Sequence, residues 1–465
     1  MDMLSCHLNR LDRIPLYEQL YEYIKKEIVE GRLGFEEKLP SKRKLADFLQ
    51  ISHNTVDTAY NQLVAEGYVE VMPRKGYFVM AYEDLAYIPK PEQPKLPAKK
   101  SNHIRYHFHP SQIDTSSFPF HEWRKLAKQF VAEEKQELLL LGSPKGEYEL
   151  QKEIANYLYH ARGVICAPEQ IIIGAGIEIL LQQLLVLLDE NTVYGVEDPG
   201  YHLIHRILST YPKQVHPLEV DEEGLIVDNL DELAIDVAYV TPSHHFPYGN
   251  ILPVNRRMQL LNWASANKAR YIIEDDYDSE FRYSGKTIPS LQSMDQYGKV
   301  IYLGSFSKSL MPSIRISYMV LPETLLNKYE ERLSFYHCTV SRIDQHILSE
   351  FIRKGLFEKH LNRMRKVYRQ KLDIVMNALK SYCEQIAIIG GHSGLHVVLQ
   401  IKNGMMEEEL VERAAEQNVK VYPLSDYMLV KKERHTPTIV LGFAGIQMEE
   451  LEEALNVLLK SWGIV

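Results

Sequence analysis

The sequence has few cysteines and no long apolar run, and each of these absences excludes a class of protein. Four cysteines occur among the 465 residues, at positions 6, 166, 338 and 383, with neither CxxC nor metal-ligand spacing between them. We therefore expect reduced thiols in a cytoplasmic protein. No stretch approaches the roughly 18 apolar residues of a membrane span, and the N-terminal residues lack the apolar core of a signal peptide.

Basic residues are fewer than acidic residues, with 53 Lys and Arg against 62 Asp and Glu. The net charge is −9 at pH 7, which excludes a uniformly basic nucleic-acid coat but allows local basic patches. Hydrophobic residues make up 45% of the chain and charged residues 25%, as in a soluble globular protein with ample core. A chain of 465 residues predicts two or more domains.

Residues 1–80 show three helical patterns followed by two short alternating strands. The expected helices are 15–31, Lys42–Leu49 and His53–Glu66. Ser41 and Ser52 stand at the N-cap positions of the second and third helices. The expected strands are 68–71 and 76–79. This order predicts a winged helix-turn-helix, and a three-helix dimerisation module with solvated charges is the alternative.

The charge of this module is positive only in places, since residues 1–80 contain 11 Lys and Arg against 12 Asp and Glu. The cations gather at the start of the second helix and at the tip of the hairpin, and short polar side chains begin the third helix. Such groups contact DNA phosphates and base edges. The predicted DNA-binding residues are Lys42, Arg43, Ser52, His53, Asn54, Thr55, Arg74, Lys75 and Gly76.

Residues 10–80 resemble the GntR-type winged helix, through the segments LPSKRKLADFL, ISHNTVDTAYNQLVAEGYVE and RKGYFV in this order. The resemblance implies double-stranded operator DNA as a partner. His53 departs from the family pattern, which usually has Arg after the Ser.

A proline-rich joint follows the winged helix. Residues 81–105 contain prolines at 89, 91, 94 and 97 together with several lysines, which predicts a semi-extended linker without a core. The remaining residues, 106–465, alternate strand-like runs with helical patterns. The expected strands are Gln170–Ile173, Thr192–Glu197, Val237–Thr241, Arg270–Glu274 and Val300–Leu303.

This alternation predicts an α/β fold built on a large, doubly wound, mostly parallel sheet. Residues 330–465 begin with long helical patterns and then show further strand signals, so we expect them to form a smaller α+β lobe. The expected strands of this lobe are Leu395–Gln400, Val419–Tyr422 and Thr438–Phe443.

The stretch VIYLGSFSKSL, residues 300–310, places a lysine where open α/β sheets build their sites. Its apolar run predicts a buried strand that delivers Ser305 and Lys308 into a polar turn. A lysine there is a candidate for Schiff-base chemistry, because desolvation beside a second cation such as Arg315 would lower its pKa. For an isolated lysine, a solvated position at a helix start is the more common case.

Other polar groups follow neighbouring strands at the same edge. Residues 174–176, Gly-Ala-Gly, precede a helix and could turn backbone N–H groups toward an anion, or could simply form a tight turn. Asp275 and Tyr277 follow an apolar strand, where they could contact a pyridinium ring, although such an acidic cluster is more often a helix cap or a solvated loop. Arg315 could bind a phosphate or could form an ion pair within the protein. Tyr201 could stack on a flat ring or could pack on the sheet.

Taken together, SFSK, the downstream Arg, the Asp-Tyr pair, the Gly turn and EDPGY resemble the fold-type I aminotransferase family over about residues 105–465. The resemblance implies the cofactor pyridoxal 5′-phosphate (PLP), joined to Lys308 as an internal aldimine. The implied cofactor-binding residues are Gly176, Ile177, Tyr201, His244, Asp275, Tyr277, Ser305, Lys308 and Arg315. In TPSHHFPYGN, either His244 or His245 stands near the expected partner of the ring O3′. No third ligand is spaced to make the pair a metal site.

The order of the two halves resembles the MocR/GabR family of bacterial transcription regulators. It implies a PLP-dependent regulator that responds to a small amino compound or to PLP itself, and that forms a domain-swapped homodimer. A working aminotransferase with an accessory DNA-binding domain is the alternative, and fold alone does not separate the two.

The family's usual arginine for a substrate carboxylate has no match at its expected position, which holds Val440. Leu203 and Asp426 stand where amino-acid-responsive relatives can place arginines, and Asp426 would repel a carboxylate. Arg434 could fold back and supply the missing contact. We therefore expect weak or absent transaminase turnover.

Overall fold

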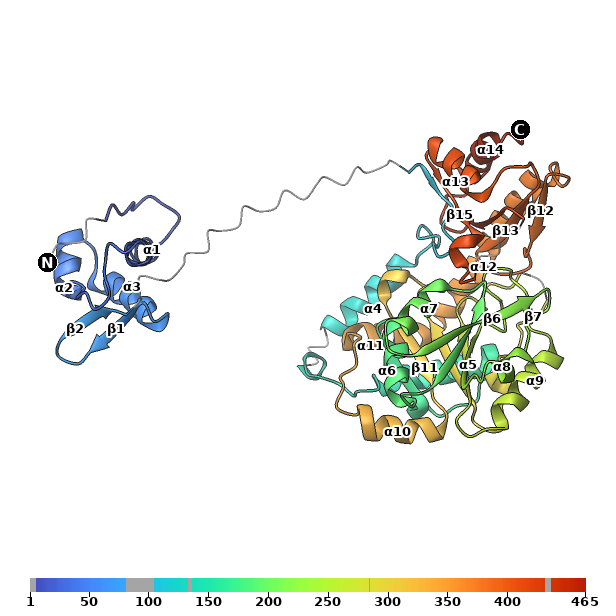
Figure 1. The fold of residues 1–465 in the computed structure, drawn as a ribbon, viewed down its shortest axis with the longest axis horizontal. Coiled ribbons are helices and arrows are strands. Elements are labelled where there is room, and N and C mark those ends of the chain that lie inside the picture. The colour runs from blue at the N-terminus through green and yellow to red at the C-terminus, as the bar shows by residue number, and fades with distance from the viewer. Residues whose placement is uncertain (1–5, 81–103, 133–135, 284, 431–435) are drawn as a thin grey trace. The chain divides into compact units, whose positions relative to one another are not determined.

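The computed structural model describes residues 6–80, 104–132, 136–283, 285–430 and 436–465. Its contacts divide the chain into two units, Met1–Lys100 and Ser101–Val465, which Figure 1 draws. The division falls inside the predicted linker, of which Ile104 and Arg105 alone lie among the described residues. No described helix is long and apolar enough to cross a membrane.

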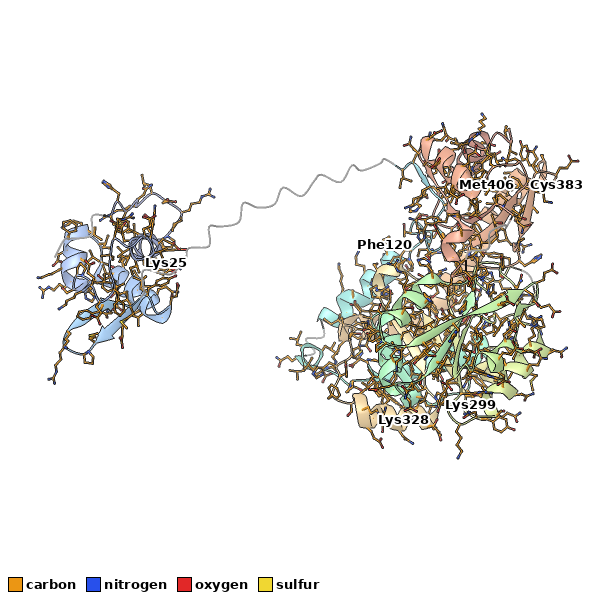
Figure 2. The ribbon with its side chains drawn as sticks, viewed as in Figure 1. Lys25, Phe120, Lys299, Lys328, Cys383 and Met406 are labelled. Atoms are coloured by element: carbon orange, nitrogen blue, oxygen red, sulfur yellow. The ribbon has the colours of Figure 1, made fainter. Side chains whose placement is uncertain are left out.

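The first unit is the predicted winged helix. Its elements are α1 (Leu16–Val29), α2 (Lys42–Leu49), α3 (His53–Ala65), β1 (Val69–Met72) and β2 (Gly76–Val79). The side chains of Ser41 and Ser52 cap α2 and α3 by accepting backbone N–H bonds at 3.3 and 3.1 Å. β1 and β2 pair antiparallel as the wing. Lys25 of α1, labelled in Figure 2, joins α1 to the end of α3 through Glu66 Oε2 at 3.0 Å.

The second unit is built on the predicted large sheet, which has eight strands. They are β4 (Ile171–Gly174), β5 (Val193–Asp198), β6 (Gln214–Asp221), β7 (Gly224–Leu225), β8 (Val237–Val240), β9 (Tyr271–Asp276), β10 (Val300–Ser305) and β11 (Ser317–Val320). The spatial order is β4-β11-β10-β9-β8-β5-β6-β7. The pairings from β10 through β9, β8 and β5 to β6 are parallel, whereas β11 and β7 run antiparallel to their neighbours.

Helices cover both faces of this sheet (Figure 1). They are α4 (Phe120–Ala132), α5 (Tyr148–Arg162), α6 (Ile177–Leu187), α7 (His202–Ser209), α8 (Asn229–Glu232), α9 (Val254–Ser265) and α10 (Glu323–Leu333). In β10, Ile301 and Leu303 pack with α6, α7 and α10, whereas Val300 packs with α8 and α9 on the other face. Both faces of the strand are therefore apolar, as a parallel sheet requires.

The smaller lobe has an antiparallel sheet in the order β12-β13-β16-β15. Its strands are β12 (Ile386–Ile389), β13 (His396–Ile401), β15 (Tyr422–Pro423) and β16 (Thr438–Gly442). The helices of the C-terminal segment are α11 (Arg342–Arg353), α12 (Leu356–Lys380), α13 (Glu407–Glu416) and α14 (Leu451–Ser461). The expected strand Val419–Tyr422 is divided, because β14 (Val419–Lys420) leaves the sheet to pair in parallel with β3 (Tyr106–His107).

Five short 3₁₀ helices complete the described elements. They are η1 (Gln136–Leu139), η2 (Pro168–Gln170), η3 (Gln292–Met294), η4 (Pro312–Ile314) and η5 (Leu424–Tyr427). One of them contributes to the site described below, since η4 lies between β10 and β11 and its Pro312 lines the cavity.

A buried ion pair ties the segment after β3 to α12. Lys371 is fully buried, and its Nζ lies 2.7 Å from Asp114 Oδ2. The same ammonium donates to the carbonyl oxygens of Ala444 and Ile446 at 2.8 and 2.7 Å. Burial raises the pKa of Asp114, but hydrogen bonds from Lys371 and Ser116 outweigh this effect and hold the pKa below its ordinary value. One charge pair thus joins three distant segments.

We expect Asp114→Ala to lower the free energy of unfolding by about 3–5 kcal/mol, because it leaves the Lys371 ammonium buried without its carboxylate. Urea denaturation of the full chain measures this. The folded pKa of Asp114 lies below its unfolded value, so the stabilisation is present at neutral pH and is lost as the pH falls through the folded pKa.

The control is Glu350→Ala, which breaks the more exposed pair with Arg353 and should cost about 1 kcal/mol or less. Equal losses in the two variants would contradict the role given to the buried pair.

Candidate functional site

A cavity of about 210 Å³ lies at the carboxyl ends of β9 and β10. Its lining includes eight of the nine residues predicted to bind the cofactor, namely Gly176, Ile177, Tyr201, Asp275, Tyr277, Ser305, Lys308 and Arg315. Parallel pairing places Asp275 beside Leu303 and Asp276 beside Gly304, so the polar residues after the two strands meet at one edge. The ninth residue, His244, lies outside the lining.

Lys308 is in the wall of this cavity, just after β10. Burial lowers the pKa of its amine, while the carboxylates of Asp278 and Asp275 act in the opposite direction. The Nζ atom lies 4.5 Å from the centroid of the Tyr277 ring. The sequence suggested that desolvation beside a second cation, Arg315, lowers this pKa. Desolvation is the largest cause of the lowered pKa of Lys308, whereas Arg315 is not among its causes and its guanidinium pairs with a carboxylate.

Asp275, at the end of β9, offers a buried acceptor to the cavity. Its Oδ2 accepts a hydrogen bond from Tyr239 Oη, whereas its Oδ1 is buried and has no partner among the described residues. Burial raises the pKa of Asp275 to about 7, although the Tyr239 hydrogen bond and Lys308 act against this. Buried polar atoms are rarely left unpaired. An unpartnered carboxylate oxygen at this wall therefore fits the protonated ring nitrogen of PLP.

Hydroxyl groups and a guanidinium also line the cavity. Ser305 Oγ lies 3.0 Å from both Ser307 Oγ and Ser317 Oγ. Gly176 caps α6 with φ +101°, and a Cβ there would lie 2.1 Å from Arg315 Nη2. Glycine thus lets the guanidinium approach the helix N-terminus. Hydroxyls, a guanidinium and first-turn N–H groups together fit a phosphate.

Glu178 lies in the same part of the cavity, and the predicted set did not include it. Its Oε2 accepts a hydrogen bond from Arg315 Nη2 at 2.7 Å, and the guanidinium also donates to the Ala175 carbonyl at 3.3 Å. The sequence feature that could have indicated Glu178 is its position as an acidic residue in the first turn of the helix that follows the Gly turn.

Tyr277, in the cavity wall, contacts a histidine that in turn contacts a carboxylate. Tyr277 Oη lies 3.0 Å from His244 Nδ1, which lies 2.8 Å from Asp278 Oδ1. Burial raises the pKa of Asp278, but His244 outweighs it and holds the pKa below its ordinary value. His244 therefore stands behind Tyr277, and Phe246 lines the cavity from the same segment. No group of three metal-ligating side chains occurs in the described part of the chain.

The remaining predictions concern the residue expected to stack on the cofactor ring and the residues expected near the carboxylate of an effector. Tyr201 lines the cavity and is 37% exposed. Val440 is buried in an apolar cluster with Phe246 and Tyr427. Asp426 lies outside the cavity lining, and Arg434 falls outside the described residues. Among the described residues, Arg315 is the one arginine that lines the cavity.

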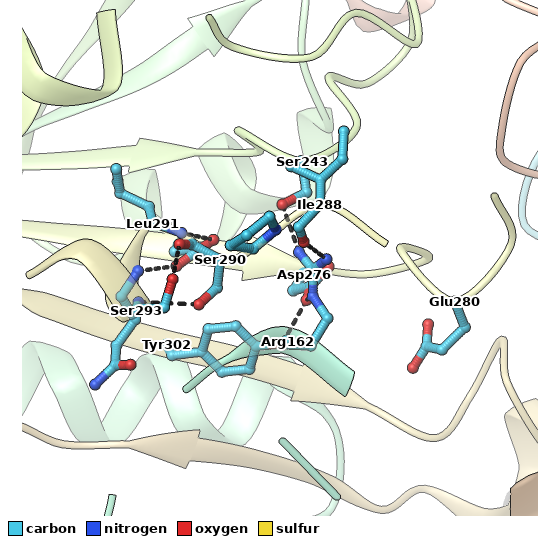
Figure 3. A network of polar contacts seen from close by, with 12 residues as sticks. Arg162, Ser243, Asp276, Glu280, Ile288, Ser290, Leu291, Ser293 and Tyr302 are labelled. Atoms are coloured by element: carbon cyan, nitrogen blue, oxygen red, sulfur yellow. Dashed lines mark hydrogen bonds and ion pairs between the residues drawn. The ribbon is translucent and has the colours of Figure 1, made fainter. Parts of the chain in front are cut away.

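A buried network of polar contacts joins segments that adjoin residues of the cavity lining (Figure 3). Arg162, at the end of α5, donates to Asp276 Oδ2 at 2.6 Å and to Ser243 Oγ at 2.5 Å. Tyr302 of β10 donates to the same Asp276 oxygen, and Arg162 also donates to the Ile288 carbonyl. Asp276 and Ser243 directly adjoin Asp275 and His244 in the chain. The network therefore fixes two predicted site segments, and none of its bonds was predicted from sequence.

In the winged helix, the predicted DNA-binding residues separate into two groups. The exposed ones are Arg43, Ser52, His53, Asn54, Arg74 and Lys75. Lys42 instead hydrogen-bonds to Asp57 of α3 and lies 4.7 Å from the Tyr77 ring centroid. Thr55 lies 2.9 Å from Ser52 Oγ, and Gly76 opens β2 with φ +116°. Lys42 thus joins α2 to α3 and the wing.

Comparison with known families assigns both units. Residues 16–79 match the bacterial regulatory proteins of the gntR family, and residues 111–458 match aminotransferase class I and II. The uncharacterized HTH-type transcriptional regulator YdeL of Bacillus subtilis is 45% identical over 98% of this chain and 99% of its own length. The probable rhizopine catabolism regulatory protein MocR of Rhizobium meliloti is 32% identical over 97% of this chain and 94% of its own.

Solved structures match the larger unit. LysN, an alpha-aminoadipate aminotransferase from Thermus thermophilus, is 26% identical with a TM-score of 0.67, over 78% of this chain and 93% of that one. An archaeal alanine:glyoxylate aminotransferase is 24% identical with a TM-score of 0.69, over 77% and 90%. The aminotransferase class I and II fold implies a PLP cofactor. The chain belongs to the MocR-type family of HTH transcriptional regulators, in which a GntR winged helix precedes an aminotransferase-like domain.

Proposed function

We propose that this transcription regulator binds operator DNA through its winged helix and binds PLP in the cavity of its larger unit, where an effector changes the state of the cofactor. The observation that carries the proposal is the composition of that cavity. A partly buried amine with a lowered pKa, Lys308, and an unpartnered carboxylate oxygen of Asp275 line the same space as Arg315 and three clustered hydroxyls.

When bound, PLP supplies an aldehyde to which amines add and a ring that withdraws electrons. Lys308 would hold the cofactor covalently, because burial favours its neutral, nucleophilic amine. Asp275 would accept the ring N–H. Ser305 and Arg315 would bind the phosphate, and Tyr277, supported by His244, would donate to the ring O3′.

The cavity favours sensing over turnover of ordinary amino acids. The position at which we expected a carboxylate-binding arginine, Val440, lies inside a buried apolar cluster. Arg315, the one arginine lining the cavity among the described residues, is paired with Glu178. We infer that the effector is a cationic or carboxylate-masked amino compound, or PLP itself.

The assembly we propose is a cytoplasmic homodimer in which the winged helices are exchanged between the two copies. Family membership supports this, together with the geometry of helix-turn-helix recognition, in which two recognition helices contact two half-sites of a duplex. The exposed start of α3, at Ser52–Asn54, is the part we expect to reach the bases.

We expect Lys308→Ala to lose the cofactor that borohydride fixes to the wild-type chain, because this lysine is the amine that joins PLP to the protein. Absorbance after reduction and the mass of the modified peptide measure the loss. The control is Lys366→Ala, since Lys366 is an exposed lysine of α12 and should leave labelling unchanged. A reducible cofactor retained by Lys308→Ala would show that the attachment site is elsewhere.

We expect common α-amino acids to convert bound PLP slowly to its amine form. A missing bidentate arginine contact costs a carboxylate ligand on the order of 2 kcal/mol or more. Each amino acid is compared with its own amide, which differs at the carboxylate, by following the cofactor spectrum. The amide should bind at least as tightly as the acid. Rapid conversion by the acid would identify the chain as a working aminotransferase.

We expect Arg43→Ala to weaken binding to an operator duplex and to reduce the slope of log affinity against log salt by about 0.9, because one phosphate contact is lost. Fluorescence anisotropy at several salt concentrations measures both. Lys152→Ala, on the exposed surface of α5, serves as the charge-matched control. Unchanged affinity of Arg43→Ala at every salt concentration would exclude this docking.

Lys42→Ala should lower the thermal stability of the winged helix, because Lys42 pairs with Asp57.

A further inference from the structure

The phosphate end of the cavity contains a carboxylate that pairs with its arginine. Glu178, the second residue of α6, lines the cavity together with Arg315 and Ser305. The distance from Arg315 Nη2 to Glu178 Oε2 is 2.7 Å. The guanidinium charge is therefore already matched by a charge of opposite sign within the protein.

The pair also lies where an anion would bind. A Cβ built on Gly176 would be 2.1 Å from Arg315 Nη2 and 2.4 Å from Glu178 Oε2, so both groups lie against the first turn of α6. The N–H groups of a helix's first turn have no partner within the helix and attract anions. A phosphate that reaches these groups meets the Glu178 carboxylate in the same space.

The side-chain charges in this part of the cavity offer a dianion no net positive charge. Arg315 and Glu178 cancel, and the other phosphate-binding groups, the hydroxyls of Ser305, Ser307 and Ser317, are neutral and bonded to one another. The side chains of Arg315 and Glu178 are 49% and 38% exposed, so each has room to move away from the other. An exposed ion pair is weak, and a phosphate can therefore replace the carboxylate at a modest cost.

We propose that Glu178 is a specificity-determining residue that makes the binding of phosphate-bearing ligands weak and reversible. A phosphomonoester must displace the Glu178 carboxylate from Arg315 Nη2 before it can accept a hydrogen bond from that atom. Occupancy of the cavity then follows the concentration of free PLP, as a sensor requires. This inference rests on the proposed binding of PLP.

The test compares PLP with pyridoxal, which carries the same ring and aldehyde but lacks the phosphate. Dissociation constants are measured by absorbance titration of cofactor-free full-length protein. Glu178→Gln should bind PLP about fivefold more tightly than wild type, because the carboxylate no longer competes for Arg315 or repels the phosphate. Its affinity for pyridoxal should not change. Glu190→Gln, which removes an exposed carboxylate outside the cavity lining, should alter neither constant.

A second pair of variants separates displacement from simple repulsion. In an Arg315→Gln background, Glu178→Gln should improve PLP binding much less than it does in wild type, because no guanidinium remains to be released. An equal gain in both backgrounds would overturn the displacement proposal. Unchanged or weaker PLP binding by Glu178→Gln alone would also overturn it, and weaker binding would show that Glu178 positions Arg315 for the phosphate. Failure of wild type to bind either PLP or pyridoxal would instead refute the proposed function.

Discussion

The buried ion pair between Arg162 and Asp276 is the interaction on which the geometry of the site depends. Both side chains are 3% exposed, and a charge at that depth is tolerated when it is paired and hydrogen-bonded. From the end of α5, the Arg162 guanidinium donates to Asp276, to Ser243 and to the Ile288 carbonyl. Since these groups adjoin the segments that line the cavity, a displaced Arg162 would shift several of those segments together.

Burial also determines the direction in which the pKa values of two cavity residues are shifted. The same desolvation lowers the pKa of Lys308 and raises the pKa of Asp275, because it penalises the charged form of each group. The cavity thus holds an amine and a carboxyl group that are both closer to neutrality than they would be in water. The amine can react with the aldehyde of a cofactor, and the carboxyl group can hydrogen-bond to a basic ring nitrogen. The cluster around Val440 consists of apolar side chains and therefore does not attract a carboxylate.

The winged helix follows the same pattern of shared polar contacts. Lys42 joins α2, α3 and the wing through Asp57 and Tyr77, so a residue at the start of a helix-turn-helix contributes to its packing. Arg43 and Lys75 remain exposed.

Local pattern by itself determined much of this protein. The apolar run Val300–Leu303, the caps Ser41 and Ser52, and the positions of Lys308 and Asp275 after apolar strands are all local features of the chain, and the structure contains each of them. β6 was not expected, because Pro217 and its polar neighbours interrupt the apolar pattern. The strand tolerates that proline near an edge of the sheet, where its other side pairs with β7 only at Val220 and Asp221.

Tertiary structure alone decided which polar groups meet. Arg315 and Glu178 are 137 residues apart in the chain, Arg162 and Asp276 are 114 apart, and His244 and Asp278 are 34 apart. The pairing of such residues depends on the order of strands in the sheet and on the helices packed against it, which residue spacing does not encode. The depth of burial, which lowers the pKa of Lys308, likewise exists once the whole unit has folded.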